Sequence, residues 1–277
     1  MIKGIEIIET IKDLAVKEGF SEIGFAKADV VEQRTIEAYN SALKNGFFAD
    51  MDYLKRNCDK RFDPRLLVEG AKSIIVFLAP FGDNKFIEEK KIRQPHISQY
   101  ARGEDYHKVI KNKLYSILKR IQDIDSSISG RPFTDSAPVL ERAWAQKAGL
   151  GFIGKNNFLI SPTAGIRNFI GVLILNIELP DDCENENISN EYSCGKCTKC
   201  LDACPTGALQ APFLLNANKC TSYLTIEKGH NKYNRTEGID YSKEINGWIF
   251  GCDECMDACP WNNRNRTSWP EFLSKQF

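Results

Sequence analysis

The chain carries the stretch Cys194-Gly-Lys-Cys197-Thr-Lys-Cys200-Leu-Asp-Ala-Cys204-Pro205. Its spacing, C-x2-C-x2-C-x3-C-P, is the bacterial signature for two [4Fe-4S] clusters, in which the fourth cysteine binds the other cluster. A shorter copy follows as Cys252-Asp-Glu-Cys255-Met-Asp-Ala-Cys259-Pro260. Two clusters of this kind take four thiolates each. The two runs supply seven cysteines, and Cys220 between them supplies the eighth.

The spacing also predicts how these cysteines divide between two clusters. A C-x2-C-x2-C loop can wrap three corners of one cube, whereas the cysteine before proline points away from it. The sequence therefore predicts one cluster bound by Cys194, Cys197, Cys200 and Cys259, and a second bound by Cys204, Cys220, Cys252 and Cys255. The alternative is a pair of structural zinc sites, because C-x2-C pairs also form tetrahedral zinc knuckles. Three cysteines at this spacing followed by Cys-Pro fit a cube better.

Length, charge and hydrophobic content limit the classes of protein to which the chain could belong. The 277 residues suffice for two domains. Lysine plus arginine number 37, as do aspartate plus glutamate, so the overall charge neither supports nor excludes a nucleic-acid partner. No segment approaches the roughly 18 consecutive apolar residues of a membrane span, so no membrane partner is expected. Residues 1–10 carry acids where a signal peptide would be apolar, which predicts a cytoplasmic protein.

The cysteine content fits a reducing compartment. Ten cysteines in a secreted chain would suggest disulfides, but most of these have cluster spacing. Cys58 and Cys183 are left over, and we expect both to be free buried thiols. Cys183 is close enough to the first run to be the alternative eighth ligand.

Hydrophobic periodicity predicts the rest of the fold. Helices are expected over 5–18, 31–44 and 105–121, with a fourth beginning near Pro138, and strands over 21–28, 72–79, 157–160 and 167–177. Helices alternating with buried strands predict a layered α/β domain, of α+β or α/β class, over residues 1–180. An acidic connector then opens a ferredoxin-like double-cluster domain over 181–277, with short helices after Cys200 and Cys255 and a polar tail from Arg264.

Other redox motifs are absent from the sequence. It has no G-x-G-x-x-G after a strand and no G-x4-G-K-[ST], so neither a nicotinamide nor an ATP site is supported. A double-cluster domain alone only moves single electrons. The electrons therefore need another redox centre or a substrate within the larger domain.

Several segments resemble one enzyme family. The stretch from Asp135-Ser-Ala-Pro-Val-Leu-Glu-Arg to Gly-Phe-Ile-Gly-Lys-Asn-Asn157 resembles the corresponding segment of epoxyqueuosine reductases, the cobalamin-dependent, two-cluster enzymes of queuosine biosynthesis. Further matching segments are Tyr100-Ala-Arg-Gly-Glu-Asp-Tyr-His107, Arg61-Phe-Asp-Pro-Arg65, Cys220-Thr-Ser-Tyr-Leu-Thr-Ile-Glu227 and Phe250-Gly-Cys-Asp-Glu-Cys255. The resemblance runs from about residue 20 to 262 in the order typical of the family.

The resemblance implies a chemistry. It implies a base-off cobalamin between the two domains, with one cluster close enough to reduce cobalt, and reduction of epoxyqueuosine in tRNA to queuosine. It also implies an external one-electron donor such as a flavodoxin or ferredoxin, and we expect a monomer. An epoxide deoxygenation needs an acid near the departing oxygen. In the family an aspartate at the position of Asp135 donates that proton.

Further site residues are expected around the cofactor. Asp135 has an alternative role as a helix N-cap, and a helix N-terminus would favour its charged form. His107 is a cobalt ligand, a general acid or a structural core histidine. The resemblance suggests that cobalamin contacts come from Arg61, Asp135, Lys155, Asn156, Ser222 and Asp253. The alternatives are a surface ion pair for Arg61, an ordinary turn at Lys155 and Asn156, and a solvated loop residue at Asp253.

The chain departs from the longer family members in one respect. Those carry a C-terminal helical-repeat domain that helps to hold tRNA, whereas this chain ends shortly after Trp261 and resembles the shorter members. Two other functions therefore stay open. One is a related corrinoid reductase on another substrate, reductive dehalogenation included. The other is a ferredoxin-type electron-transfer protein whose larger domain only docks a partner.

Overall fold

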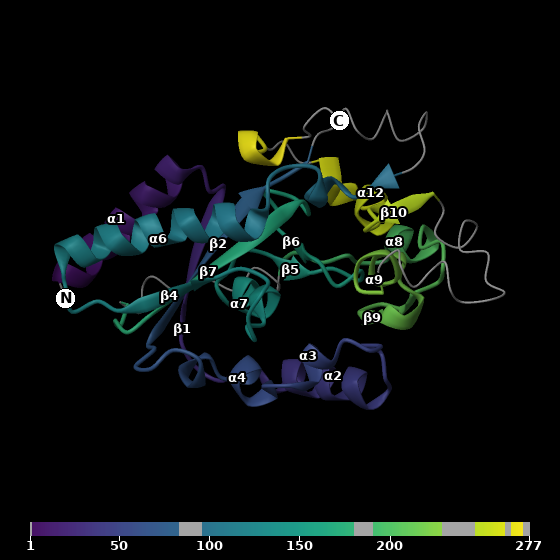
Figure 1. Cartoon of the computed structure of the whole chain (residues 1–277), viewed down its shortest axis with the longest axis horizontal. Helices are drawn as coiled ribbons and strands as arrows, with labels where there is room; N and C mark the ends of the chain where they lie inside the picture. Colours follow the sequence, from purple (N-terminus) through teal and green to yellow (C-terminus); the bar gives the residue numbers. More distant parts are fainter. Residues whose placement is uncertain (1, 83–95, 180–190, 229–246, 264–266, 274–277) are drawn as a thin grey trace.

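The computed structural model describes residues 2–82, 96–179, 191–228, 247–263 and 267–273. At its centre lies a four-stranded sheet with the order β1-β2-β7-β4, in which all neighbouring strands are antiparallel. Its strands are β1 (Glu22–Lys27), β2 (Ser73–Pro80), β7 (Asn168–Leu175) and β4 (Gly130–Phe133). Helices α1 (Ile2–Glu18) and α6 (Tyr106–Ile124) cover one face, and α7 (Glu141–Lys147) packs on the other, as Figure 1 shows.

Strand β2 is buried along its whole length because both faces of the sheet are covered. Ile75 and Phe77 belong to the core beneath α1 and α6, whereas Ile74 and Val76 belong to the core beneath α7. Burying an aliphatic or aromatic side chain of this size stabilises a fold by about 1.5–3 kcal/mol. The expected strands over 21–28, 72–79 and 167–177 are confirmed.

An arm of short helices follows β1 and lies below the sheet in Figure 1. It consists of α2 (Gln33–Lys44), α3 (Asp52–Lys55), α4 (Cys58–Phe62) and the 3-10 turn η1 (Pro64–Leu66). The arm contacts the cysteine-rich part of the chain. The Asn218 amide donates to the Gly46 carbonyl at 2.8 Å, and the Tyr53 hydroxyl donates to the Glu227 carboxylate at 3.1 Å.

The cysteine-rich part is built from short elements, at the right of Figure 1. They are α8 (Lys199–Asp202), β8 (Leu209–Ala211), β9 (Leu214–Leu215), η5 (Ala217–Lys219), α9 (Thr221–Ile226), β10 (Trp248–Phe250), α12 (Glu254–Asp257) and η6 (Pro260–Asn263). The last turn, η7 (Pro270–Phe272), belongs instead to the core beneath α1 and α6. Strand β10 pairs in parallel with β3 (His96–Ile97), which precedes η2 (Gln99–Ala101), while β5 (Phe152–Ile153) and β6 (Leu159–Ile160) form a hairpin. The short helices expected after Cys200 and Cys255 are present as α8 and α12, each of which begins one residue before its cysteine.

One strand was not predicted, and two local expectations were wrong. Residues 130–133 form strand β4, whose Pro132 is tolerated because β4 is an edge strand. The fourth helix begins at Glu141, not near Pro138. The strand expected over 157–160 is only the two-residue β6.

The C-terminal segment is not a polar tail. Trp269 and Phe272 are buried in the core beneath α1 and α6. The Trp269 indole N–H donates to the Gly19 carbonyl, and its ring lies 5.0 Å from that of Phe20. The segment around Trp269 is thus anchored to the residues that follow α1. The expected domain boundary at 180/181 and the leftover Cys183 lie outside the described residues.

Candidate active site and cluster centres

The seven cysteines of the two runs, together with Cys220, form two groups according to which thiols raise one another's pKa. Burial, with smaller contributions from the neighbouring Cys194, Cys200 and Cys197, raises the pKa of the Cys259 thiol to about 11. Burial is also the largest cause of the raised pKa of Cys255. The neighbouring thiols Cys252, Cys220 and Cys204 raise it in decreasing order, and Cys200 of the other group contributes least. Burial and Cys204 raise the pKa of Cys220. These neighbours match the pairing expected from spacing, which stays a prediction.

The cysteines are not arranged for single ions. Among the described side chains, no three histidine, cysteine, aspartate or glutamate residues converge on one metal ion, as a zinc knuckle would require. Eight cysteines with the C-x2-C-x2-C-x3-C-P spacing and its shorter copy suit two cubes of iron and sulfide, which are ligated by deprotonated cysteines. The chemistry of the donor set therefore fits [4Fe-4S] clusters.

A buried arginine holds the second cysteine run in place. Arg167, fully buried at the start of β7, donates through Nε to the Asn262 side chain at 2.9 Å and through Nη2 to the Asp257 carboxylate. Its Nη1 lies 3.7 Å from an oxygen of Asp253. Both aspartates flank cluster cysteines. Sequence reasoning missed this residue, although an arginine opening an apolar strand run was a visible signal.

Replacing Arg167 with methionine should lower the free energy of unfolding by about 3–5 kcal/mol, because Asp253 and Asp257 would lose a buried counter-charge. Chemical denaturation of the full chain measures this. The control is Arg34→Met, which breaks an exposed ion pair with Glu32 and should cost less than about 1 kcal/mol. Equal losses in the two variants would contradict a structural role for the buried network.

Asp253 is a buried, hydrogen-bonded residue. The alternative prediction of a solvated loop residue was wrong. Its side chain is 2% exposed. One oxygen accepts from the Ser98 hydroxyl at 2.5 Å, and the other accepts from the Gln99 backbone N–H at 2.8 Å. Asp253, which directly follows Cys252, thus connects the second cysteine run to the start of η2.

Lys155 and Asn156 also contact the cysteine-rich part. The Lys155 ammonium donates to the carbonyls of Gly195 at 2.7 Å and Cys197 at 2.8 Å. The buried Asn156 amide donates to the Cys255 carbonyl at 3.2 Å. A side chain on Gly154 would press against the ends of the Asn156 and Ile160 side chains, so glycine leaves room for Asn156 in this tight turn. The turn is therefore a junction and not an ordinary surface turn.

Arg61 is buried, which excludes the surface ion pair as its role. Its Nη2 donates to the Tyr53 carbonyl at 3.1 Å, while its buried Nε has no hydrogen-bond partner among the described residues. Ser222 is half-buried, and its backbone N–H donates to the Cys220 thiol. Arg61 thus offers a donor that a ligand could satisfy.

Asp135 lies in a turn with a left-handed backbone conformation, at φ 56°. Its side chain is 61% exposed. The Tyr106 hydroxyl donates to Oδ2 of Asp135, and Nε2 of His107 lies 3.4 Å from the same oxygen. The Asp135 backbone N–H donates to the Glu141 carboxylate. Asp135 does not cap a helix, because α7 begins at Glu141 with Leu140 before it, and His107 is not a core histidine.

Tyrosines from three segments surround the carboxylate. Burial raises the pKa of Tyr100 to about 12, with the charge of Asp135 as the next cause. Burial also raises the pKa of Tyr53 to about 12, with smaller contributions from Glu227 and Asp135. The charge of Asp135 thus acts on tyrosines of the arm and of η2, so these side chains lie near its carboxylate. Tyr106, whose hydroxyl binds Asp135, stacks on Phe169 at 4.2 Å.

The side chain of Glu141 should make stability pH-dependent. Burial, followed by the charge of Asp135, raises the pKa of Glu141 from 4.5 to about 8. The folded state therefore holds a proton that the unfolded state releases above about pH 4.5, so the contribution of Glu141 to stability falls as pH rises to about 8.

Replacing Glu141 with glutamine should raise the unfolding temperature by about 2–4 °C at pH values above about 8, and by less near pH 5. Glutamine keeps the oxygen that accepts from Asp135 but cannot ionise. Thermal unfolding at both pH values measures the effect. The control is Glu178→Gln, at a side chain that is 80% exposed, which should change neither. A gain of equal size at both pH values would contradict the raised pKa.

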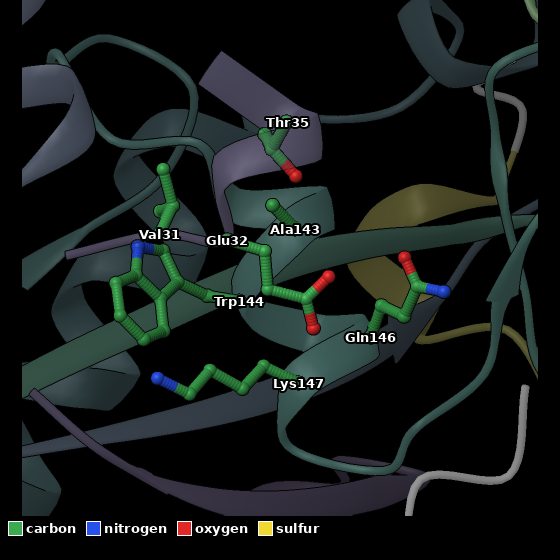
Figure 2. Close-up of a pocket in the computed structure, with 7 residues that line it drawn as sticks. All are labelled: Val31, Glu32, Thr35, Ala143, Trp144, Gln146 and Lys147. Carbon is green, nitrogen blue, oxygen red and sulfur yellow. The ribbon is translucent and has the colours of Figure 1, made fainter. Parts of the chain in front are cut away.

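A separate narrow pocket lies between the start of α2 and the helix α7 (Figure 2). It is lined by Val31, Glu32, Thr35, Ala143, Trp144, Gln146 and Lys147. The Trp144 indole nitrogen is buried without a hydrogen-bond partner among the described residues. This pocket shares no residue with the cluster cysteines or the surroundings of Asp135, so it is distinct from the candidate active site.

Comparison with known proteins identifies the family. The model of the 4Fe-4S double cluster binding domain matches residues 193–262, and that of epoxyqueuosine reductase QueG, DUF1730, matches residues 61–136. Epoxyqueuosine reductase of Cyclobacterium marinum is 41% identical over 92% of this chain and 78% of its own length. The chain belongs to the epoxyqueuosine reductase family. The enzyme of that name from Leadbetterella byssophila is 43% identical over 91% of this chain and 79% of its own length.

Solved epoxyqueuosine reductases share the fold. One, with a tRNA-Tyr epoxyqueuosine-modified tRNA stem loop, has a TM-score of 0.78 at 27% identity and covers 98% of this chain and 69% of its own. Another, from Bacillus subtilis with an aspartate catalytic loop swung out of the active site, has a TM-score of 0.78 at 28% identity with the same coverage. The double-cluster match decides against the zinc alternative. Among the described residues no helix is long and apolar enough to cross a membrane.

Proposed function

We propose that this chain is a cobalamin-dependent epoxyqueuosine reductase, which converts epoxyqueuosine to queuosine in tRNA with electrons delivered through two [4Fe-4S] clusters. The observation that carries the proposal is the position of Asp135. In a chain 41% identical to an epoxyqueuosine reductase, its exposed carboxylate lies near Tyr53, Tyr100 and Tyr106, and Tyr53 binds Glu227 at the end of α9, the helix that directly follows Cys220. A proton donor and an electron path thereby meet at one place.

The reaction defines what the residues must do. Converting an epoxide to an alkene takes two electrons and two protons and releases water. Asp135 would give a proton to the departing oxygen, while Tyr106 and His107 hold its Oδ2 and leave Oδ1 towards the substrate. Glu141 would keep the turn in place through the Asp135 backbone N–H. The aspartate catalytic loop of the Bacillus subtilis relative supports this role.

Cobalamin, when bound, would supply a low-valent cobalt reductant. Its amide side chains accept and donate hydrogen bonds, and the buried unpartnered Nε of Arg61 fits such an acceptor. Ser222, half-buried beside Cys220, is a second candidate contact. The polar groups of Lys155, Asn156 and Asp253 already bind protein groups, so we propose that these residues shape the cofactor site by holding the surrounding loops.

The metal ligands complete the proposal. One cluster is bound by Cys194, Cys197, Cys200 and Cys259, and the other by Cys204, Cys220, Cys252 and Cys255. The charge of Asp253, next to Cys252, contributes to the raised pKa of Tyr100 beside Asp135, after the effect of burial. This neighbourhood favours the second cluster as the one that passes electrons to the active site.

We also propose the wider setting. An external one-electron donor such as a flavodoxin or ferredoxin reduces the clusters, and the chain works as a monomer in the cytoplasm. Residues 1–180 and 181–277 form its two domains. The second domain has a small core of its own, made of Ala217, Tyr223 and Leu224, while its Met256 and Cys259 belong to the core beneath α1 and α6.

The test is an anaerobic assay of the cluster-reconstituted chain with cobalamin, a strong reductant and epoxyqueuosine-containing tRNA, followed by mass spectrometry of the digested nucleosides. Queuosine is expected only when cobalamin is present. No conversion, with clusters and bound cobalamin verified in the same sample, would favour a related corrinoid reductase on a smaller substrate. Failure to bind any corrinoid would favour an electron-transfer protein.

A further inference from the structure

The turn formed by residues 154–158 joins β5 to β6 and meets the cysteine-rich part at three places. The Lys155 ammonium binds the Gly195 and Cys197 carbonyls, and the Asn156 amide binds the Cys255 carbonyl. The Phe213 backbone N–H donates to the Lys155 carbonyl at 3.0 Å. Two hydrogen bonds of 2.8 Å within the turn, from Gly154 to the Phe158 carbonyl and from Asn157 to the Gly154 carbonyl, make it rigid.

The position of the ammonium group is specific. Both carbonyls that it binds belong to the loop 194–197, between two proposed ligands of the first cluster. Lys155 is half-buried, whereas Lys196 and Lys199 on that cysteine run are exposed to solvent. A charge held against the loop by protein is less screened than one in water. Of these three lysines, Lys155 should therefore act most strongly on the cluster.

The positive charge of Lys155 lies beside only one of the two proposed clusters. The neighbouring Asn156 contacts Cys255, a proposed ligand of the second cluster, with a neutral amide. A reduced cluster carries one more negative charge than the oxidised form, and cluster potentials respond to nearby charge and hydrogen bonds. A fixed positive charge beside the first cluster stabilises its reduced form.

We propose that Lys155 is a positioning residue that raises the reduction potential of the cluster bound by Cys194, Cys197, Cys200 and Cys259 through the carbonyls of its binding loop. The proposal rests on the proposed pairing of the cysteines but not on the substrate. Lys155 therefore connects the larger domain to the loop that binds the first proposed cluster. This role differs from the corrin contact that we expected from sequence.

The test is a redox titration of the reconstituted full chain, followed by electron paramagnetic resonance, without cobalamin or tRNA. Replacing Lys155 with glutamine keeps N–H donors but removes the charge. One of the two cluster potentials should fall so that the ratio of reduced to oxidised cluster at a fixed potential drops about tenfold, which is about 59 mV for one electron. The charge-conserving Lys155→Arg should change that ratio less than about twofold.

The matched control is Lys199→Gln, which removes the same charge at an exposed position on the same cysteine run. It should change the ratio less than about twofold, because water and salt screen an exposed charge. The proposal is overturned by an equal shift in Lys199→Gln, or by unchanged potentials in Lys155→Gln. Loss of the cluster in Lys155→Gln would leave Lys155 only a structural role and would also overturn it. None of these outcomes depends on whether the chain reduces epoxyqueuosine.

Discussion

Replacing Asp135 with asparagine should lower turnover of epoxyqueuosine at least about 100-fold, the smallest usual contribution of a positioned general acid. Iron content and cobalamin binding should stay at the wild-type level. Asparagine has the same shape and tolerates the left-handed backbone at φ 56°, so the turn should keep its conformation. What is lost is the carboxylic acid proton. The measurement is the single-turnover rate of queuosine formation, with iron and corrinoid determined in the same sample.

The control for this variant is Ser136→Ala in the same exposed turn. Its hydroxyl accepts from the Lys111 ammonium at 2.6 Å, but it carries no acid. We expect this change to lower turnover less than about tenfold, well short of the loss of a general acid. Near-wild-type turnover of Asp135→Asn would refute the proton-donor role and would direct attention to His107, 3.4 Å from the same carboxylate oxygen.

The elements that sequence predicted well are those with strong hydrophobic patterns. Helix α6 places Ile110, Leu114 and Ile117 on one buried stripe, and β2 is apolar at every position except its ends. Strand β4 has neither a helical stripe nor a continuous apolar run, because it is short, lies at an edge and contains Pro132. It forms only because β7 offers a free edge, which is a tertiary contact that no local pattern encodes.

The residues of the candidate site also fall into those that local sequence predicts and those that depend on distant contacts. The cluster cysteines follow from spacing, since their ligand loops are local, and Asp135 followed from a motif. Tyr106 and Arg167 could not be found so directly, because their partners lie 29 residues or more away in sequence. Lys155 was predicted as a cofactor contact, which stays a prediction, whereas its hydrogen bonds to the Gly195 and Cys197 carbonyls were not foreseen. Its sequence neighbours show a tight turn, whereas only the folded chain shows which carbonyls that turn faces.

Replacing Cys220 with alanine should remove one cluster and leave the other. The reconstituted chain should fall from about eight iron atoms to about four, because the second cluster would keep only three thiolates. Cys220 contributes to the raised pKa of Cys252 and Cys255, which places it among the proposed ligands of that cluster. Iron and sulfide analysis, together with electron paramagnetic resonance of the reduced protein, measures the change.

The same substitution at Cys58 serves as the control. Its thiol donates to the carbonyls of Lys55 and Leu54 in the arm and has no part in either proposed ligand set, so Cys58→Ala should keep about eight iron atoms. Two intact clusters in Cys220→Ala would show that the eighth ligand lies elsewhere, with Cys183 the next candidate. Loss of both clusters would instead mean that the two cubes form together. That outcome is physically reasonable, because Cys255 and Cys259 sit at the two ends of one turn and are proposed to bind different clusters.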